Sequence, residues 1–340
     1  MADSPMYTLG RKMGQPRSST SRGENALPSN AHGCAISMRP RSTSRYLFAL
    51  ASILTIWTNP AICAQPDRQA LTVLDLSEKQ LHSVFPELAG LKSVDTQAHL
   101  PTILQHVAAS EDAFLRNIPD LTAREDIVVQ QQSHAGGMDR TFPVFSGKYT
   151  YLVLAHRESD GGHLVEYRTD LKGKEIKPGL DFAPASTQGF ALLALFFDSF
   201  HQTLASFRYL GRQQVDRREM YVVAFAQRPD AAPLTGQIYS GGKLTSTAYQ
   251  GIAWIDPVKF QIRQMRTDLL EPLPDVGLRA QTTEIHFMEV HLPDVATPLW
   301  LPRTVVVSSE LNGHLVRNRH TYRNYQRFAA NSRIVTAPLP

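Results

Sequence analysis

The sequence predicts an α+β fold: a strongly bent antiparallel sheet, or half-barrel, of about ten or eleven strands, covered by helices and preceded by a helical segment. The main observation is a long series of short runs rich in β-branched and aromatic residues. Turn-forming residues separate the runs, and Asp256-Pro257 and Asn312-Gly313 are strong hairpin signals. Clear helical patterns occur in three stretches, all before residue 207.

The hairpin around Asp256-Pro257 is the clearest pair of strands, and we expect it in the middle of the sheet. Pro257 suits the second position of a type I turn, because its ring already fixes φ there. Apolar residues near period two flank the turn, with Tyr249, Ile252, Trp254 and Ile255 before it and Phe260, Ile262 and Met265 after it.

The three helical stretches differ in character. Ser77–Gln80 has the form of a capping box, which predicts a helix after Ser77. Gly189–Leu204 is apolar almost all round, which is typical of a buried helix or of one that covers an apolar surface. Thr102–Ile118 is an amphipathic helix that Pro119 ends, and its apolar face consists of Ile103, Val107, Phe114 and Ile118.

Composition and charge indicate a globular protein with a basic leader. The chain of 340 residues is 42% hydrophobic and 19% charged, with a formal net charge of +4. Residues 1–64 hold seven of the 35 basic and two of the 31 acidic residues. The rest of the chain therefore has 28 basic and 29 acidic residues and a formal net charge of −1. We therefore expect no nucleic-acid partner. Both cysteines, Cys34 and Cys63, lie in the leader, which excludes a disulfide or cysteine–metal site after it.

The leader predicts export to the periplasm or the medium. Arginines precede the apolar run Tyr46–Trp57, and small residues follow, as in a signal peptide cleaved near Ala64. The run is too short for a transmembrane span, so we expect none after cleavage. Cys63 raises a lipoprotein alternative, although the residues before it fit a lipobox badly. Either translation starts at Met38 or residues 1–45 are unstructured.

The expected organisation is therefore a disordered or untranslated leader over residues 1–45, the signal-peptide core and cleavage site over 46–64, a helical appendage over 65–99, and a single antiparallel half-barrel domain over 100–340. No internal linker is rich enough in Gly, Ser or Pro to divide the strands.

Motifs for catalysis, metals and cofactors are missing from the sequence. No HExxH, GxSxG, GxGxxG or P-loop string occurs, so we expect no metal, no cofactor and no catalytic residue. The twelve histidines are scattered. The best alternative for an enzyme is a hydrolase in which His286 works beside Glu284 or Glu289, but a half-exposed polar strand explains these residues equally well.

Two surfaces are candidates for binding. One is a basic face of the last long strand, formed by Arg317, Arg319 and Arg323, which suits an anionic headgroup or a partner's carboxylates, or simply protects an edge. The other is an apolar face of the curved sheet, which either packs against the helices as a filled core or encloses an apolar ligand. Its predicted residues are Tyr221, Val223, Phe225, Ile252, Trp254, Phe260, Ile262, Ile285 and Phe287.

The region Phe207–Met265 resembles the periplasmic lipoprotein carriers (Lol carriers) and related half-barrels. The resemblance lies in the strand pair FRYLGRQQVDRREMYVVAF, which is followed by GIAWIDPVKFQIRQM with its hydrophobic-Asp-Pro turn. It implies a bent antiparallel sheet whose apolar cavity holds acyl chains, and it supplies no catalytic residue. We therefore expect a non-catalytic module that binds a lipid or lipidated peptide. An envelope protein–protein interaction or regulatory module with a filled core is the alternative.

Overall fold

The computed structural model describes the greater part of the chain after the leader. All described residues belong to one compact unit, Gln65–Pro340. The predictions for the signal peptide, the start codon and both cysteines lie outside the described residues. These are residues 71–135, 138–158, 161–176, 192–231, 236–240 and 243–328.

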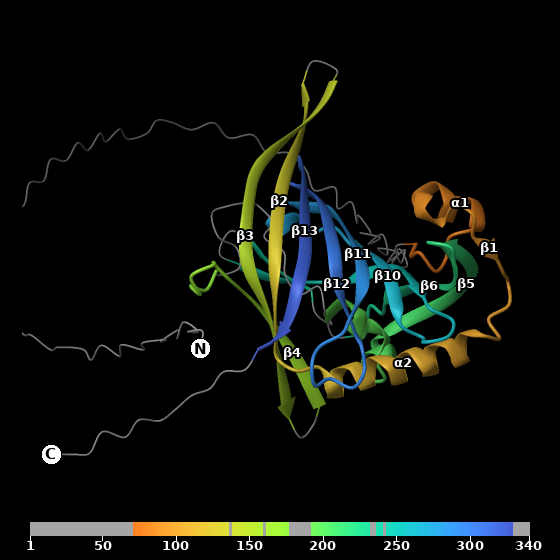
Figure 1. Cartoon of the computed structure of the whole chain (residues 1–340). Coiled ribbons are helices and arrows are strands. Elements are labelled where there is room, and N and C mark those ends of the chain that lie inside the picture. Colours follow the sequence, from red (N-terminus) through yellow and green to blue (C-terminus); the bar gives the residue numbers. More distant parts are fainter. Residues whose placement is uncertain are drawn as a thin grey trace, which may run out of the picture. The chain divides into compact units, whose positions relative to one another are not determined.

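The core of the fold is an 11-stranded antiparallel sheet, which confirms the predicted fold class (Figure 1). The strand order is β1-β5-β6-β9-β10-β11-β12-β13-β2-β3-β4. The strands of this sheet are β1 (Lys92–Ser93), β2 (Leu121–Ala135), β3 (Met138–Glu158), β4 (Gly161–Thr169), β5 (Ala205–Val215), β6 (Arg218–Gln227), β9 (Tyr249–Ile255), β10 (Ile262–Leu269), β11 (Leu278–Val290), β12 (Leu299–Leu311) and β13 (His314–Arg327), and β7 (Gly236–Ser240) pairs with β8 (Lys243–Thr247) in a separate hairpin.

The sheet has an inner and an outer face because it curls around one apolar core. Tyr209 of β5 and Leu164 of β4 lie near opposite ends of the strand order, yet they belong to the same buried cluster. We call the face that carries this cluster the inner face. The turn at Asn312-Gly313 shows how the sequence sets the pairing: both residues have positive φ, 51° and 77°, as a two-residue hairpin turn requires.

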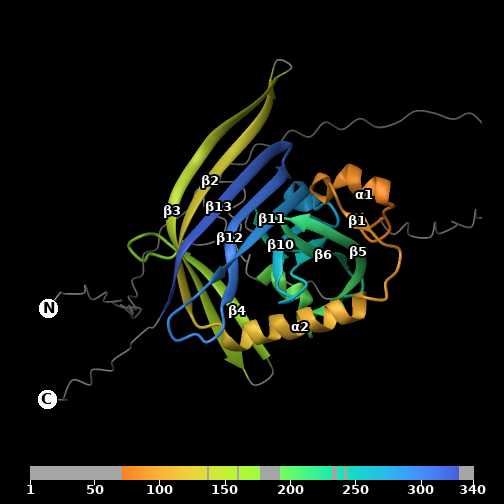
Figure 2. The same ribbon diagram turned by 45° about the vertical axis from the view of Figure 1, so that its right-hand side comes forward.

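Two helices cover different faces of the sheet (Figures 1 and 2). α2 (Leu100–Asn117) contributes Ile103 and Val107 to the inner core, as its periodicity predicts. α1 (Glu78–Val84) begins at the expected capping box and packs on the outer face of β5, β6 and β9, together with the 3₁₀ helix η1 (Pro86–Leu88). The segment predicted as an appendage also supplies β1, which pairs with β5.

The apolar stretch predicted as one helix is different in the structure. Within the described residues it forms two 3₁₀ helices, η2 (Leu192–Phe197) and η3 (His201–Leu204). Asp198 lies between them, and its carboxylate accepts a hydrogen bond from the backbone N–H of His201 at 2.6 Å. The carboxylate of Asp112 in α2 accepts a second one, from the backbone N–H of Ser199 at 3.2 Å. These side-chain bonds to the backbone compete with helical hydrogen bonds and divide the stretch.

The Asp256-Pro257 hairpin is confirmed, but its turn is longer than predicted. The backbone N–H of Phe260 donates to the carbonyl of Asp256 at 2.9 Å, and Phe260 has a φ of 53°. Phe260 therefore belongs to the turn and not to β10. The Asp256 carboxylate explains the shape, because it accepts the N–H groups of Val258 and Lys259 at 3.0 and 2.9 Å.

Gly251 is the position where the hairpin tolerates no side chain. A Cβ atom there would lie 2.0 Å from the backbone oxygen of Arg266 and 3.0 Å from the ring of Phe225. We expect Gly251→Ala to lower the free energy of unfolding by about 1–3 kcal/mol, because the backbone of the neighbouring strand must move. Urea denaturation measures this loss, and an unchanged midpoint would contradict the close approach of the two strands.

Candidate functional site

The structure brings together most, but not all, of the predicted apolar face. Val223, Phe225, Ile262 and Ile285 are buried in the inner core, and Tyr221, Phe260 and Phe287 pack against it. Ile252 and Trp254 do not belong to this face. They lie on the outer face, buried under α1 beside Leu81 and Phe85. Their assignment to the same face as the others is wrong.

The error has a physical cause. Successive side chains of a strand point to opposite faces, so Ile252 and Trp254 cannot share a face with Ala253 and Ile255. β9 is buried on both faces, and nearly every residue in it is apolar. Gln250 is the single strongly polar residue of β9 and has the phase of Ile252 and Trp254, so alternation gives only this one sign of the outer side. Trp254 Nε1 donates to Gln213 Oε1 at 2.7 Å, which satisfies the indole under α1.

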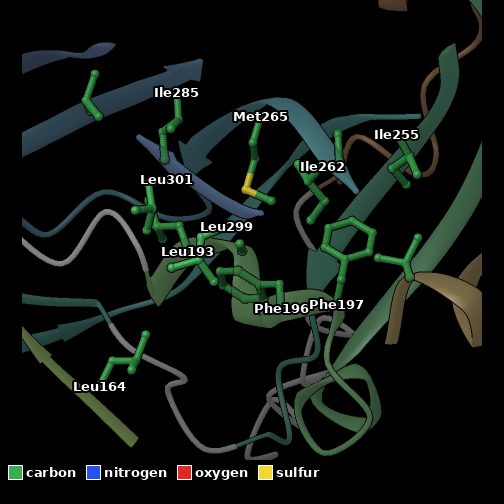
Figure 3. Packing of buried hydrophobic residues seen from close by; sticks show 14 of the residues in the cluster. Leu164, Leu193, Phe196, Phe197, Ile255, Ile262, Met265, Ile285, Leu299 and Leu301 are labelled. Carbon is green, nitrogen blue, oxygen red and sulfur yellow. The ribbon is translucent and has the colours of Figure 1, made fainter. Parts of the chain in front are cut away.

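The middle of the inner face is occupied by η2. Residues 193–197 are five consecutive buried residues, and Figure 3 shows Leu193, Phe196 and Phe197 among the side chains of the sheet. Phe196 and Phe197 also contact Phe225, with ring centroids 5.1 and 5.4 Å apart. In this region the chain itself covers the apolar face.

A pocket of about 150 Å³ remains at the margin of this core, between α2 and β10–β12. Two predicted residues, Ile262 and Phe287, line it. Ala194 of η2 also contributes to the lining, so the pocket adjoins the covered part of the inner face. The remaining residues of its lining are Ser110, Glu111, Ala113, Phe114, Asn117, Gln261, Thr297, Pro298, Leu299 and Trp300.

The wall of this pocket contains polar groups without partners. In the described part of the chain, Gln261 Oε1 and Trp300 Nε1 are buried and make no hydrogen bond. Glu111, which is 7% exposed, completes this wall. Burial, reinforced by the charges of Asp198 and Asp112, raises the pKa of Glu111 to about 8, so its carboxyl is mainly neutral at pH 7.

A second feature of the inner face is a buried ion pair at the far side of the sheet. Glu125 of β2 and Arg168 of β4 are 0% and 3% exposed. Arg168 Nε and Nη2 donate to the two carboxylate oxygens of Glu125 at 2.6 and 2.8 Å. Tyr322 OH donates to Oε1 at 2.9 Å, and His320 Nδ1 lies 2.8 Å from the same oxygen.

These contacts make Glu125 a structural anchor. Burial opposes the charge of Glu125, but hydrogen bonds from His320 and Arg168 outweigh burial and lower its pKa to about 2. Burial lowers the pKa of His320, so a neutral ring must hold its proton on Nδ1 to donate to the carboxylate. Three of the four hydrogen bonds end on Oε1 and one ends on Oε2, so donors of the protein itself hold the charge of Glu125.

No family model and no curated protein matches this chain. Among solved structures, a DUF1329 family protein from Desulfovibrio piger is similar at 11% identity and a TM-score of 0.35, over 68% of this chain and 94% of that one. A putative outer membrane lipoprotein-sorting protein domain from Vibrio parahaemolyticus is similar at 12% identity and a TM-score of 0.33, over 66% of this chain and 90% of that one.

A third similar structure is the Pseudomonas aeruginosa MucA/MucB complex, at 13% identity and a TM-score of 0.20, over 68% of this chain and 100% of that one.

The predicted hydrolase and basic residues lie on the outer face. His286 is exposed there, opposite Thr304 of β12. Arg317, Arg319 and Arg323 share this face of β13, and all three are exposed. Among the described residues, no group of three or more His, Cys, Asp or Glu is placed to hold a metal ion, and no helix is long and apolar enough to cross a membrane.

Glu111 and Glu125 are not among the residues predicted from the sequence, although the position of each in its element gives a signal. Glu111 follows Val107 by four residues and precedes Ile118 by seven, which places it within the apolar stripe of α2. Glu125 lies two residues from Ala123 and from Ile127, so it has the phase of the buried side of β2. A charged residue in an apolar phase predicts either a partner or a shifted pKa.

Proposed function

We propose that this protein is a non-catalytic module of the bacterial envelope that binds an apolar ligand, a lipid or lipidated peptide, at the inner face of its sheet. The observation that carries the proposal is the pocket between α2 and β10–β12, which is lined by Phe114, Ile262 and Phe287 and adjoins the apolar core. A concave, mainly apolar site with a few polar groups is the usual form of a small-molecule site.

The pocket limits what it holds in this state. A cavity of about 150 Å³ accepts a molecule of the size of benzene, so it fits the end of an acyl chain or one apolar side chain. A neutral Glu111 suits such a ligand, because an ionised carboxylate in the wall would oppose the approach of apolar groups. Binding of a longer chain requires η2 to move, since Ala194 forms part of the lining.

Displacement of a dansyl-labelled fatty acid tests this function. Ala113→Trp should fill the pocket and weaken probe binding by roughly tenfold or more, because the ligand loses its apolar contact area. Ala109→Trp is the matched control: it lies four residues earlier on α2, is exposed and is outside the pocket, so probe binding should be unchanged.

Two results would overturn the proposal. One is a wild-type protein that shows neither saturable probe binding nor a co-purifying lipid in native mass spectrometry. The other is equal probe affinity in wild type and Ala113→Trp, which would place any binding elsewhere. The second candidate function, an envelope interaction module, is favoured by the five buried residues of η2 that fill the inner face. If this second function is correct, the wild-type protein should show neither saturable probe binding nor a co-purifying lipid.

A further inference from the structure

The open part of the outer face carries an excess of positive charge that neither the pocket nor the core explains. α1 covers the outer face of β5, β6 and β9. On β12, β13, β2 and β3, which follow one another in the sheet, most outward residues are exposed or half-buried. Among the side chains that the structure describes, six exposed cationic residues occupy outward positions of these four strands: Arg124, Lys148, Arg303, Arg317, Arg319 and Arg323.

Register places these cations on one surface. Arg319 lies opposite Val128, Arg317 opposite Gln130 and Arg323 opposite Arg124, and in an antiparallel pair opposite residues share a face. Lys148 lies opposite Asp126, which shares the phase of Arg124 and Val128. Arg303 lies at the bulge of β12 and lines an outer groove of about 460 Å³ with Arg218 and His286.

Few of these charges are neutralised. Asp126 pairs with Arg323, and Glu310 of β12 is paired with Arg279 of β11. In the part of the chain that the structure describes, Arg124, Lys148, Arg303, Arg317 and Arg319 have no carboxylate within ion-pair distance. The unit as a whole is close to neutral, so this face is a local concentration and not a consequence of overall charge.

The concentration is unfavourable for the isolated fold. Arg124 and Arg323 lie directly opposite each other, and like charges in that position destabilise a sheet. Edge protection does not require them either, because β12, β13 and β2 are interior strands of the sheet. A surface that is unfavourable in isolation and exposed on interior strands is best explained by an anionic partner.

We propose that this outer face docks the protein on an anionic membrane surface, with the arginines bound to lipid phosphates. The cations spread over an area of about 15 by 20 Å, from a strand spacing of about 4.8 Å and a rise of about 3.4 Å per residue. Guanidinium groups bind phosphate through paired hydrogen bonds. Lipids move laterally to meet irregularly spaced arginines, whereas an acidic protein must match them in one fixed register.

Other features of the face agree with lipid. Val128 and Leu315, which are 37% and 48% exposed, lie among the arginines and offer shallow apolar contact at the headgroup level. Single-stranded nucleic acid is usually held by aromatic rings that stack on its bases. On the described outward positions that pair across β13, β2 and β3, none is aromatic.

Sedimentation with vesicles tests the docking. The compact unit Gln65–Pro340 is used, because the basic leader would bind anionic lipid by itself. We expect this unit to bind vesicles of mixed phosphatidylglycerol and phosphatidylcholine, but not vesicles of phosphatidylcholine alone. Binding should be lost in about 1 M salt, where charges are screened within about 3 Å.

The variant Arg317→Glu/Arg319→Glu should bind the mixed vesicles on the order of 30-fold more weakly, at about 1 kcal/mol for each arginine removed. Lys172→Glu/Lys174→Glu, on an exposed turn, changes the net charge equally and should bind as the wild type does. Equal loss in both variants, or no binding by the wild type, overturns the proposal. Binding of the wild type to an acidic envelope protein in place of vesicles would also overturn it.

Discussion

Glu125→Gln is expected to destabilise the protein by about 3–5 kcal/mol at pH 7, because it removes the carboxylate charge that pairs with the buried Arg168 guanidinium. The side chain of Arg168 is 3% exposed and donates twice to this carboxylate. Glutamine keeps the shape of glutamate but cannot compensate the positive charge of Arg168. The midpoint of urea denaturation measures the loss of stability. An unchanged dependence of the unfolding free energy on urea concentration would show that the variant unfolds in the same two-state transition.

A double variant separates lost charge compensation from lost packing. Glu125→Gln with Arg168→Met removes both charges and should recover much of the stability, since a buried pair replaced by apolar groups is often neutral. A double variant no more stable than the single one would contradict this explanation, because Arg168 would then not be the source of the cost. The same cycle gives the coupling energy between the two positions.

The dependence on pH follows from the direction of the shift. The pKa of Glu125 is lowered to about 2 in the folded state, whereas an unfolded glutamate titrates near pH 4.3. Its contribution to stability is therefore present above pH ~4.3 and is lost as pH falls through 2. Wild type should lose stability across this acid window, and Glu125→Gln should lose less there. Parallel acid profiles would contradict the assignment.

The sequence predicted the sheet and its local signals well because short-range chemistry determines them. Asn312-Gly313 requires a two-residue hairpin, and Ser77 begins α1 through its own side chain. The faces of β9 were not predicted, because the strand is buried on both sides and almost wholly apolar, and Gln250 alone marks its outer side. The packing of α1 shows that Trp254 lies outward.

The candidate site was less predictable, because it depends on contacts between distant segments. Glu125 and Arg168 are 43 residues apart in the chain, and Glu125 and Tyr322 are 197 apart. The pocket likewise combines α2 with β10–β12. Only the part of the basic face on β13 was predicted. The sequence of one strand shows which of its residues share a face, but it does not show which strands pair with it or in which register.

Glu111→Gln is expected to have the opposite effect to Glu125→Gln. Burial first, and the charges of Asp198 and Asp112 next, raise the pKa of Glu111 to about 8 in the folded state. A raised folded pKa gives stability that is fully present below the unfolded value, near 4.3, and is lost as pH rises towards 8. Each pH unit in this window costs about 1.4 kcal/mol.

Glutamine does not titrate, so Glu111→Gln should unfold at higher urea concentration than wild type at pH 8, by a few kcal/mol on this arithmetic. The two proteins should be similar at pH 4, where glutamate is largely protonated in both states. Glu271→Gln, on an exposed loop, is the control and should change stability little at either pH. A Glu111→Gln variant that is less stable at pH 8 would show that the carboxylate has a partner and is not an isolated buried acid. The pocket would then have a charged wall under physiological conditions, and an apolar ligand there would be disfavoured.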